Sequence, residues 1–199
     1  MRHRYPVALW VSLWVIAASN AAPATLSDTA PDTSASFTAD GRLRPPEHYR
    51  EWIFLTSGLD MTYRKGSAAD HSMFDNVFVD PRAYRAFVQT GTWPEGTLLV
   101  KEGRAASEKG SINQGGKFQS GEAMGFEVHM KDSKRFAGGW AFFFFDSVRS
   151  EPTSMIPAAA PCYSCHRANG AVDTSFVQFY PTLLSIATQK HTLSAGYRP

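Results

Sequence analysis

Hydrophobic and polar residues follow a strand-like pattern in several short segments of the chain. The segment "SMFDNVFVD" (72–80) alternates, and "GTLLVKE" (96–102), "GEAMGFEVHMKD" (121–132) and "GGWAFFFFDSV" (138–148) each follow a glycine and are rich in β-branched or aromatic residues. Such segments, bounded by polar turns, are typical of strands. The stretch "WIFLTSG" (52–58) is a further strand candidate. Their regular, hairpin-like spacing predicts an antiparallel sheet.

Three other segments predict helices. A short helix is expected over 47–52, and "DPRAYRAFVQTG" (80–91) predicts a second, with Asp80 as N-cap, Pro81 at its first position and Gly91 beyond its end. Residues 173–189, "DTSFVQFYPTLLSIATQ", predict a third helix capped by Asp173, which Pro181 should kink or limit. The sequence therefore predicts a single α+β domain, a mostly antiparallel sheet with short flanking helices.

The N-terminus has the three parts of a secretory signal peptide. Arg2 and Arg4 precede an apolar run over 7–18, and small residues follow up to Ala21. The run is shorter than the roughly 20 residues that span a bilayer, so we expect cleavage after residue 21 and export to the periplasm; a retained membrane anchor is the alternative. We expect 22–45 to be a disordered leader, 46–190 the folded domain and 191–199 a flexible tail.

The charge of the chain is nearly balanced. It has 20 Lys and Arg residues against 18 Asp and Glu, and signal cleavage removes two of the arginines. A balanced charge argues against nucleic acid or an anionic membrane surface as the partner of the mature protein.

The only two cysteines stand in the motif "CYSCH", which contains Cys162, Cys165 and His166. A disulfide between them would close a very small loop and stabilise little, and a zinc site would need further ligands. A thioredoxin-like pair should follow a strand, whereas a proline-rich segment precedes this motif. In an exported chain the pattern is typical of c-type haem attachment, with two thioether bonds and the histidine as the axial iron ligand.

The position of the motif excludes two common haem proteins. Small helical cytochromes take a downstream methionine as the second axial ligand, but all six methionines precede this motif. Four-helix-bundle cytochromes need long amphipathic helices upstream, and the sequence has none. The sequence therefore predicts a haem iron with an open site in another fold.

Four segments of the chain resemble the cytochrome P460 family of periplasmic c-type haem proteins. They are "EHYREWIFLTSGLDMTY", "MFDNVFVDPRAYRAFVQTGTWPEGTLLVKE", "GGWAFFFF" and "CYSCHRANGAVDTSFVQFYPTLL". The resemblance implies one haem lying against the sheet, a five-coordinate iron and a homodimer. The family includes hydroxylamine-oxidising enzymes and gas-binding cytochromes c-prime.

The resemblance also gives Lys101 a role. In the hydroxylamine-oxidising branch, a lysine in a similar "VKE" context is joined covalently to the haem macrocycle. Strand alternation turns Thr97, Leu99 and Lys101 to one face and Leu98, Val100 and Glu102 to the other. In an apolar haem pocket, burial should lower the pKa of Lys101 and free its amine as a nucleophile. The alternative is a strand-end lysine whose ammonium reaches water.

Other residues are weaker candidates. Phe126 is a candidate wall of the distal haem pocket, with ordinary core packing as the alternative. His129 is the histidine whose strand position best suits a distal approach to the iron, although a surface or hydrogen-bonded role fits it better. The run 142–145 should place aromatic rings on both faces of its strand. Residues 152–161 contain no acid to accept protons, so Glu102, Glu127, Asp146 and Glu151 are the candidate substitutes.

Two functions of different classes follow. The first is oxidation of hydroxylamine to nitrous oxide or nitric oxide, with electrons passed to a periplasmic acceptor such as another cytochrome. The second is non-catalytic binding of nitric oxide. Lys101 favours the enzyme, and the missing acid before the motif favours the binding protein.

Overall fold

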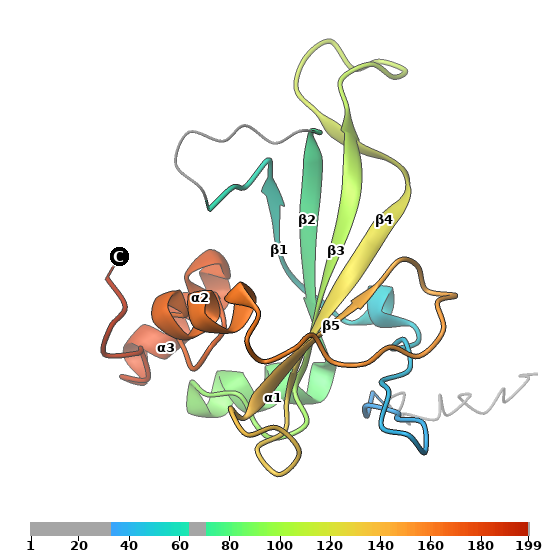
Figure 1. The fold of residues 1–199 in the computed structure, drawn as a ribbon. Coiled ribbons are helices and arrows are strands. Elements are labelled where there is room, and N and C mark those ends of the chain that lie inside the picture. The colour runs from blue at the N-terminus through green and yellow to red at the C-terminus, as the bar shows by residue number, and fades with distance from the viewer. Residues whose placement is uncertain (1–32, 64–70, 199) are drawn as a thin grey trace, which may run out of the picture. The chain divides into compact units, whose positions relative to one another are not determined.

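A five-stranded antiparallel sheet forms the centre of the fold (Figure 1). The computed structural model describes residues 33–63 and 71–198. The strands are β1 (Ile53–Leu59), β2 (Met73–Val79), β3 (Leu98–Ser107), β4 (Phe118–Lys131) and β5 (Trp140–Phe145). Each strand pairs antiparallel with the next along the chain. The predicted α+β class and antiparallel sheet are confirmed.

The helices are short. They are the 3-10 turns η1 (Tyr49–Glu51) and η2 (Val177–Phe179) and the helices α1 (Pro81–Thr90), α2 (Pro161–Asn169) and α3 (Pro181–Gln189). The predicted ends of α1 are confirmed, because Asp80 accepts a hydrogen bond from the Ala83 N–H and Gly91 closes the helix in the left-handed region.

The helix predicted over 173–189 starts later than expected. Asp173 has a φ of 52° and caps no helix, and α3 begins at Pro181. Proline lacks an N–H and fits the first turn of a helix rather than its interior. The preceding residues therefore form the separate turn η2.

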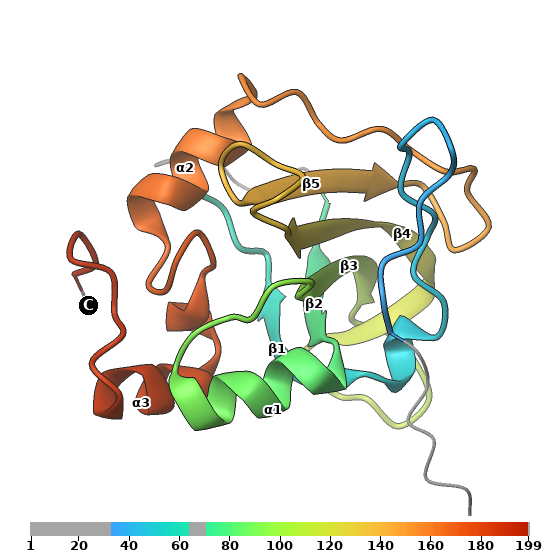
Figure 2. The same ribbon diagram turned by 90° about the horizontal axis from the view of Figure 1, so that it is seen from below.

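Alternation along the strands gives the sheet two different faces. The first face packs beneath residues 33–52, and the second beneath α1, α2 and α3; Figure 2 shows the sheet between the two sets of segments. The core of the first face consists of Leu43, Tyr49, Trp52, Leu98, Val100, Phe126, Val128, Met130, Phe136, Ala141, Phe143 and Phe145. That of the second consists of Val79, Ala83, Phe87, Trp93, Leu99, Trp140, Ala171, Val172, Val177, Tyr180, Leu183 and Ala187.

Both ends of the predicted domain are ordered further than expected. Within the predicted leader, Leu43 pairs with Phe37 and Thr153 through isolated bridges and is buried. In the predicted tail, Leu193 and Tyr197 pack against the core of the second face. Apolar side chains in otherwise polar segments account for both differences. The predicted signal peptide lies outside the described residues.

None of the helices in residues 33–63 and 71–198 has the length and apolar character needed to cross a membrane.

Candidate functional site

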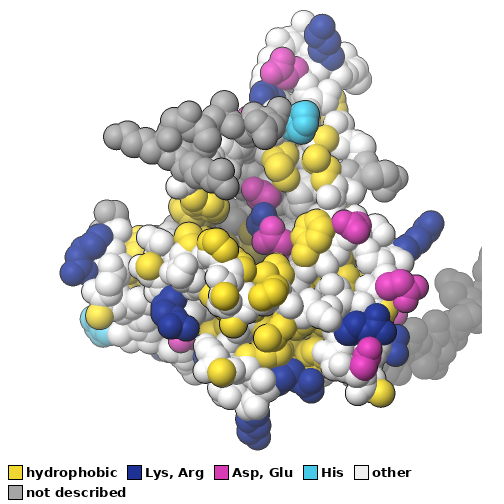
Figure 3. Space-filling model, in the orientation of Figure 1, with side chains coloured by type: hydrophobic (Ala, Val, Ile, Leu, Met, Phe, Trp, Pro, Cys, Tyr) yellow, Lys and Arg dark blue, Asp and Glu magenta, His cyan; other side chains and the backbone are white. Residues whose placement is uncertain are grey.

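A pocket opens on the second face of the sheet. Figure 3 shows hydrophobic side chains around a hollow that holds acidic and basic groups. The walls come from β1 to β5, the segment that follows β1, α2 and the residues just before α3. The lining residues are Thr56, Gly58, Met61, Tyr63, Asp75, Val77, Leu99, Lys101, Glu127, His129, Phe142, His166, Phe176, Phe179 and Tyr180.

The cysteine-histidine motif lies on α2 beside this pocket. Cys162, Cys165 and His166 are three and four positions apart, so one face of the helix carries all three. Both cysteines are free thiols and half-buried. His166 lines the pocket. The helix starts at Pro161 and ends when the Gly170 N–H bonds the His166 carbonyl.

One ring nitrogen of His166 is already engaged. Its Nδ1 lies 2.7 Å from the carbonyl oxygen of Thr174, and because a carbonyl only accepts, Nδ1 carries the proton. Burial lowers the pKa of His166, which favours the neutral ring. Nε2 is then the unprotonated nitrogen, which is the form that ligates a metal.

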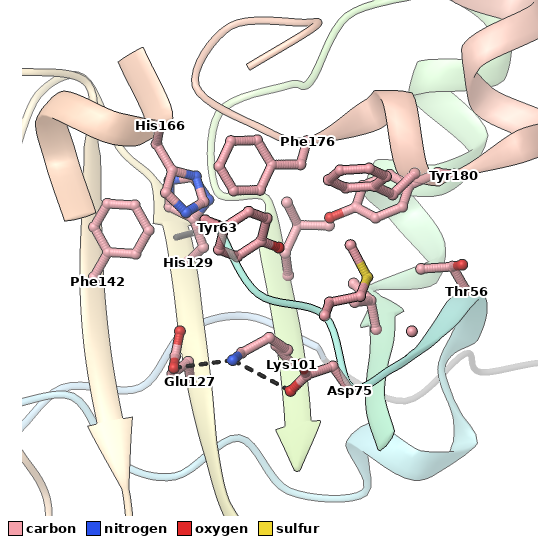
Figure 4. A pocket seen from close by; sticks show the side chains of 15 residues that line it. Thr56, Tyr63, Asp75, Lys101, Glu127, His129, Phe142, His166, Phe176 and Tyr180 are labelled. Atoms are coloured by element: carbon pink, nitrogen blue, oxygen red, sulfur yellow. Dashed lines mark ion pairs between the residues drawn. The ribbon is translucent and has the colours of Figure 1, made fainter. Parts of the chain in front are cut away.

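Aromatic rings surround this imidazole (Figure 4). Phe176 stacks on it with a centroid distance of 4.0 Å, and Phe142 meets it at 4.6 Å at a steep angle. The ring of His129 lies 5.0 Å away, edge to face. His166 is thus held by packing as well as by its hydrogen bond.

His129 lies beside His166 rather than across the pocket from it. The side chain is buried, stacks on Phe142 at 4.1 Å and contacts Thr174 Oγ1 through Nε2 at 3.4 Å. Burial, followed by the neighbouring His166, holds the pKa of His129 well below its usual value. The distal approach considered from the sequence is therefore wrong, while the hydrogen-bonded interpretation is confirmed.

Lys101 points into the pocket from β3, as strand alternation predicts (Figure 4). Its Nζ lies 3.2 Å from Glu127 Oε1 and 3.4 Å from Asp75 Oδ1. Burial alone would lower the pKa of Lys101, but the two carboxylates outweigh it and raise the pKa. The lowered pKa expected from the sequence is therefore wrong, and the group in this structure is an ammonium.

Asp75 is a site residue that the sequence analysis missed. It lies on β2 near Val77, the cross-strand partner of Lys101. Within the described residues its Oδ1 is buried and makes no hydrogen bond, so the ion pair with Lys101 is its polar contact. The sequence feature that could have identified it is an acidic residue within the mostly apolar strand segment "MFDNVFV". Tyr63, Phe176 and Tyr180 were also missed.

The four acids proposed as proton acceptors lie in different parts of the structure. Glu127 is the one of them that lines the pocket; Asp146 and Glu151 do not. Glu102 is buried on the first face, where Tyr49, Arg50 and Arg104 bond it.

Phe126 does not line the pocket. It is buried on the first face between Tyr49 and Phe145, so the distal-wall prediction is wrong. The reason is its register, since Phe126 lies opposite Glu102 and therefore shares its face. Of the run 142–145, Phe142 lines the pocket while Phe143 and Phe145 fill the first core, so the prediction of two faces is confirmed.

These residues fit a c-type haem. An imidazole with an unprotonated Nε2 and a charged lysine line the same mainly apolar pocket, and two free thiols lie on the helix face that carries the imidazole. Cys162 and Cys165 would form the thioether bonds, and His166 would be the axial ligand.

The family model described as cytochrome P460 matches residues 46–177. No curated protein matches the chain.

Proposed function

This chain belongs to the cytochrome P460 family, and we propose that it is an exported c-type haem protein that oxidises hydroxylamine. Membership of the family implies that it binds haem. The observation that carries the proposal is the pocket itself, where the His166 imidazole and the Lys101 ammonium with its two carboxylates face the same apolar space.

Three residues of α2 would hold the cofactor. Cys162 and Cys165 would be its thioether attachment points, and His166 its axial ligand with Nδ1–H donated to the Thr174 carbonyl. When bound, the haem would supply an iron with one open coordination position and a redox couple that takes electrons from the substrate. The contribution of α2 is to fix the orientation of these bonds.

Lys101 is the residue proposed to join the macrocycle covalently, as the family resemblance implies. An ammonium has no lone pair for a new bond, so Lys101 must first lose a proton. Glu127 and Asp75 are the groups within reach of that proton, at 3.2 and 3.4 Å. The new carbon–nitrogen bond would form at the expense of one π bond of the macrocycle, with the proton passed on from these carboxylates to the ring. The interrupted conjugation would move the absorption to the red.

Glu127 and Asp75 are also the proposed proton acceptors during turnover. Oxidation of hydroxylamine to nitrous oxide or nitric oxide releases as many protons as electrons, so the pocket needs a base. Their carboxylates lie in a pocket whose walls include Leu99, Phe142 and Phe176. These apolar walls would exclude competing water from the open site.

The proposal includes a setting for the protein. The signal peptide predicted over 1–21 would export the chain to the periplasm, where electrons would pass to another redox protein such as a small cytochrome. We also propose a homodimer, as the resemblance implies. Size-exclusion chromatography with light scattering of the purified protein checks the dimer, and a monomer at all concentrations would contradict it.

Steady-state oxidation of hydroxylamine with an artificial electron acceptor tests the function. The wild-type protein should reduce many equivalents of acceptor per haem. The double variant Asp75→Asn, Glu127→Gln should keep its haem and lose about 10²-fold or more in rate. Glu108→Gln, an exposed carboxylate paired with Lys117, is the matched control and should keep full activity. An absence of turnover in the wild type would overturn the proposal.

The visible spectrum tests Lys101 separately. The wild type should absorb to the red of an ordinary c-type haem, and Lys101→Leu should restore the ordinary spectrum while keeping the fold. Lys117→Leu, another ion-paired lysine, is the control and should keep the wild-type spectrum. Identical spectra for wild type and Lys101→Leu, with no haem-bearing Lys101 peptide in a digest, would contradict the cross-link.

Binding of nitric oxide without catalysis is the second candidate function. The observation that favours it is the raised pKa of Lys101, since Glu127 and Asp75 stabilise the ammonium against loss of its proton. In that case the haem would remain an ordinary c-type haem. Stoichiometric nitric oxide binding by the ferrous protein, without turnover of hydroxylamine, would identify this function.

A further inference from the structure

The loop that follows α2 is fixed at several points. It carries the Thr174 carbonyl, which accepts the hydrogen bond from His166 Nδ1. Trp93 Nε1 donates to Ser175 Oγ at 2.7 Å, and Ser175 Oγ donates to the Val172 carbonyl at 2.8 Å. Lys131 Nζ lies 2.9 Å from Asp173 Oδ2. The loop is therefore tied to β4 at Asp173, before Thr174, and to the connection between α1 and β3 at Ser175, after it.

His129 contacts this loop and the axial histidine at the same time. Its Nε2 lies 3.4 Å from the hydroxyl of Thr174, whose carbonyl oxygen is 2.7 Å from His166 Nδ1. Its ring lies edge to face with His166 at 5.0 Å. One side chain thus borders both the ligand ring and the residue that accepts its hydrogen bond.

The position of His129 on the sheet is itself rigid. Its ring stacks on Phe142 at 4.1 Å and packs against Trp140 at 4.3 Å. Leu99 lies opposite it on β3. A polar side chain buried in such an aromatic site needs a partner, and the Thr174 hydroxyl is its hydrogen-bond contact.

We propose that His129 is a positioning residue for His166. Its contact with the Thr174 hydroxyl fixes the Thr174 carbonyl beneath Nδ1, and its ring holds the plane of the His166 imidazole. The inference rests on iron ligation by His166, as set out under the proposed function, and does not depend on hydroxylamine being the substrate.

The consequence is electronic as well as geometric. A hydrogen bond from Nδ1–H to a carbonyl raises the basicity of the other ring nitrogen, and such outer partners tune an iron site. A more basic ligand stabilises ferric iron over ferrous iron. Loss of the His129–Thr174 contact should therefore weaken ligand donation and raise the reduction potential.

The test is the reduction potential of the holoprotein, together with the iron–histidine stretching band of its ferrous form by resonance Raman. His129→Phe keeps an aromatic ring against Phe142 and removes the ring nitrogens. It should shift the reduction equilibrium by about tenfold, which is about 59 mV for a one-electron couple, and lower the stretching frequency. His129→Gln keeps a polar group, so its reduction potential and stretching frequency should lie between those of His129→Phe and those of the wild type.

Thr174→Val makes the same test from the other side, with less risk to the fold. It removes the hydroxyl and keeps the backbone carbonyl. Like His129→Phe, it should therefore raise the reduction potential and lower the stretching frequency. Combined with His129→Phe it should add little, because both remove one contact.

Val128→Ala is the control for instability. Val128 precedes His129 on β4 and is buried on the opposite face, so this variant should lower the melting temperature and leave the potential unchanged. The proposal would be overturned if haem-loaded His129→Phe and Thr174→Val both kept the wild-type potential and band. A protein that lacked turnover but showed these shifts would contradict the proposed function alone.

Discussion

At the residue scale, Lys101 and Glu102 show how strand position decides chemistry. They are adjacent in sequence, yet Lys101 points into the pocket and Glu102 is 1% exposed on the other face. Alternation within one strand predicts this difference. The faces of Phe126 and Glu127 were harder to assign, because they depend on the pairing of Phe126 with Glu102 and of Glu127 with Lys101. Sequence alone does not give that register.

Glu102 belongs to a buried ionic cluster rather than to the site. Arg50 Nε lies 2.7 Å from its Oε2, and Tyr49 and Arg104 also donate to it. Burial would raise the pKa of Glu102, but these hydrogen bonds, from Tyr49, then Arg104, then Arg50, outweigh it and lower the pKa. Its contribution to stability is therefore present above the ordinary glutamate pKa and is lost as the pH falls through the lowered value.

Glu102→Gln should consequently be less stable than the wild type by about 2 kcal/mol near neutral pH. The difference should shrink on acidification, because the wild-type carboxylate becomes protonated and loses its advantage. Chemical denaturation followed by circular dichroism at several pH values measures it. Glu108→Gln, with an exposed side chain, should show no comparable loss. A constant difference from neutral to strongly acidic pH would contradict the assignment.

At the element scale, the end signals of helices predicted α1 well and the C-terminal helices poorly. Asp80, Pro81 and Gly91 mark the bounds of α1 through local hydrogen bonding and backbone preference. The haem motif itself lies on α2, whose N-cap Ala160 makes no side-chain hydrogen bond. Such a helix has few local signals in its sequence, and its place in the fold depends on packing beside the pocket.

Asp80 links α1 to the sheet and offers a test of this element. Its Oδ1 accepts from the Ala83 N–H at 2.7 Å, and its Oδ2 accepts from the buried Leu98 N–H at 3.0 Å. Asp80→Ala removes both bonds and should cost about 2–3 kcal/mol. Asp80→Asn keeps one acceptor oxygen and should cost less. Thermal unfolding measures both, and equal melting temperatures for Asp80→Ala and the wild type would rule out this role.

At the scale of the whole molecule, the sequence identifies the attachment residues but not the complete site. Cys162, Cys165 and His166 stand together in one motif, so local spacing reveals them. Asp75, Phe176 and Tyr180 come from distant parts of the chain, and only the packing of the η2 segment beside β2 on one face of the sheet brings them together. Residues 22–45 were predicted to be disordered from their polar composition. That composition gives no sign that Leu43 is buried in the core.

Leu43 tests whether that segment belongs to the folded unit. It is 1% exposed in the first core and bridges Phe37 and Thr153. Leu43→Ala should destabilise the protein by about 2–4 kcal/mol through lost burial and the cavity left behind. Leu59→Ala, at an exposed position of β1, should change stability by less than about 1 kcal/mol. Equal stability for Leu43→Ala and the wild type would show that this segment does not support the core.

The most direct test of the whole account is the intact mass of the purified, denatured holoprotein. We predict the mass of the processed polypeptide plus one haem, because Cys162 and Cys165 hold the cofactor through thioether bonds that survive denaturation. Lys101→Leu, which removes the proposed third attachment point, should keep the haem mass, and adding Cys162→Ala and Cys165→Ala to it should give the polypeptide mass alone. A wild-type protein that released its haem on denaturation, leaving the bare polypeptide mass, would contradict the account.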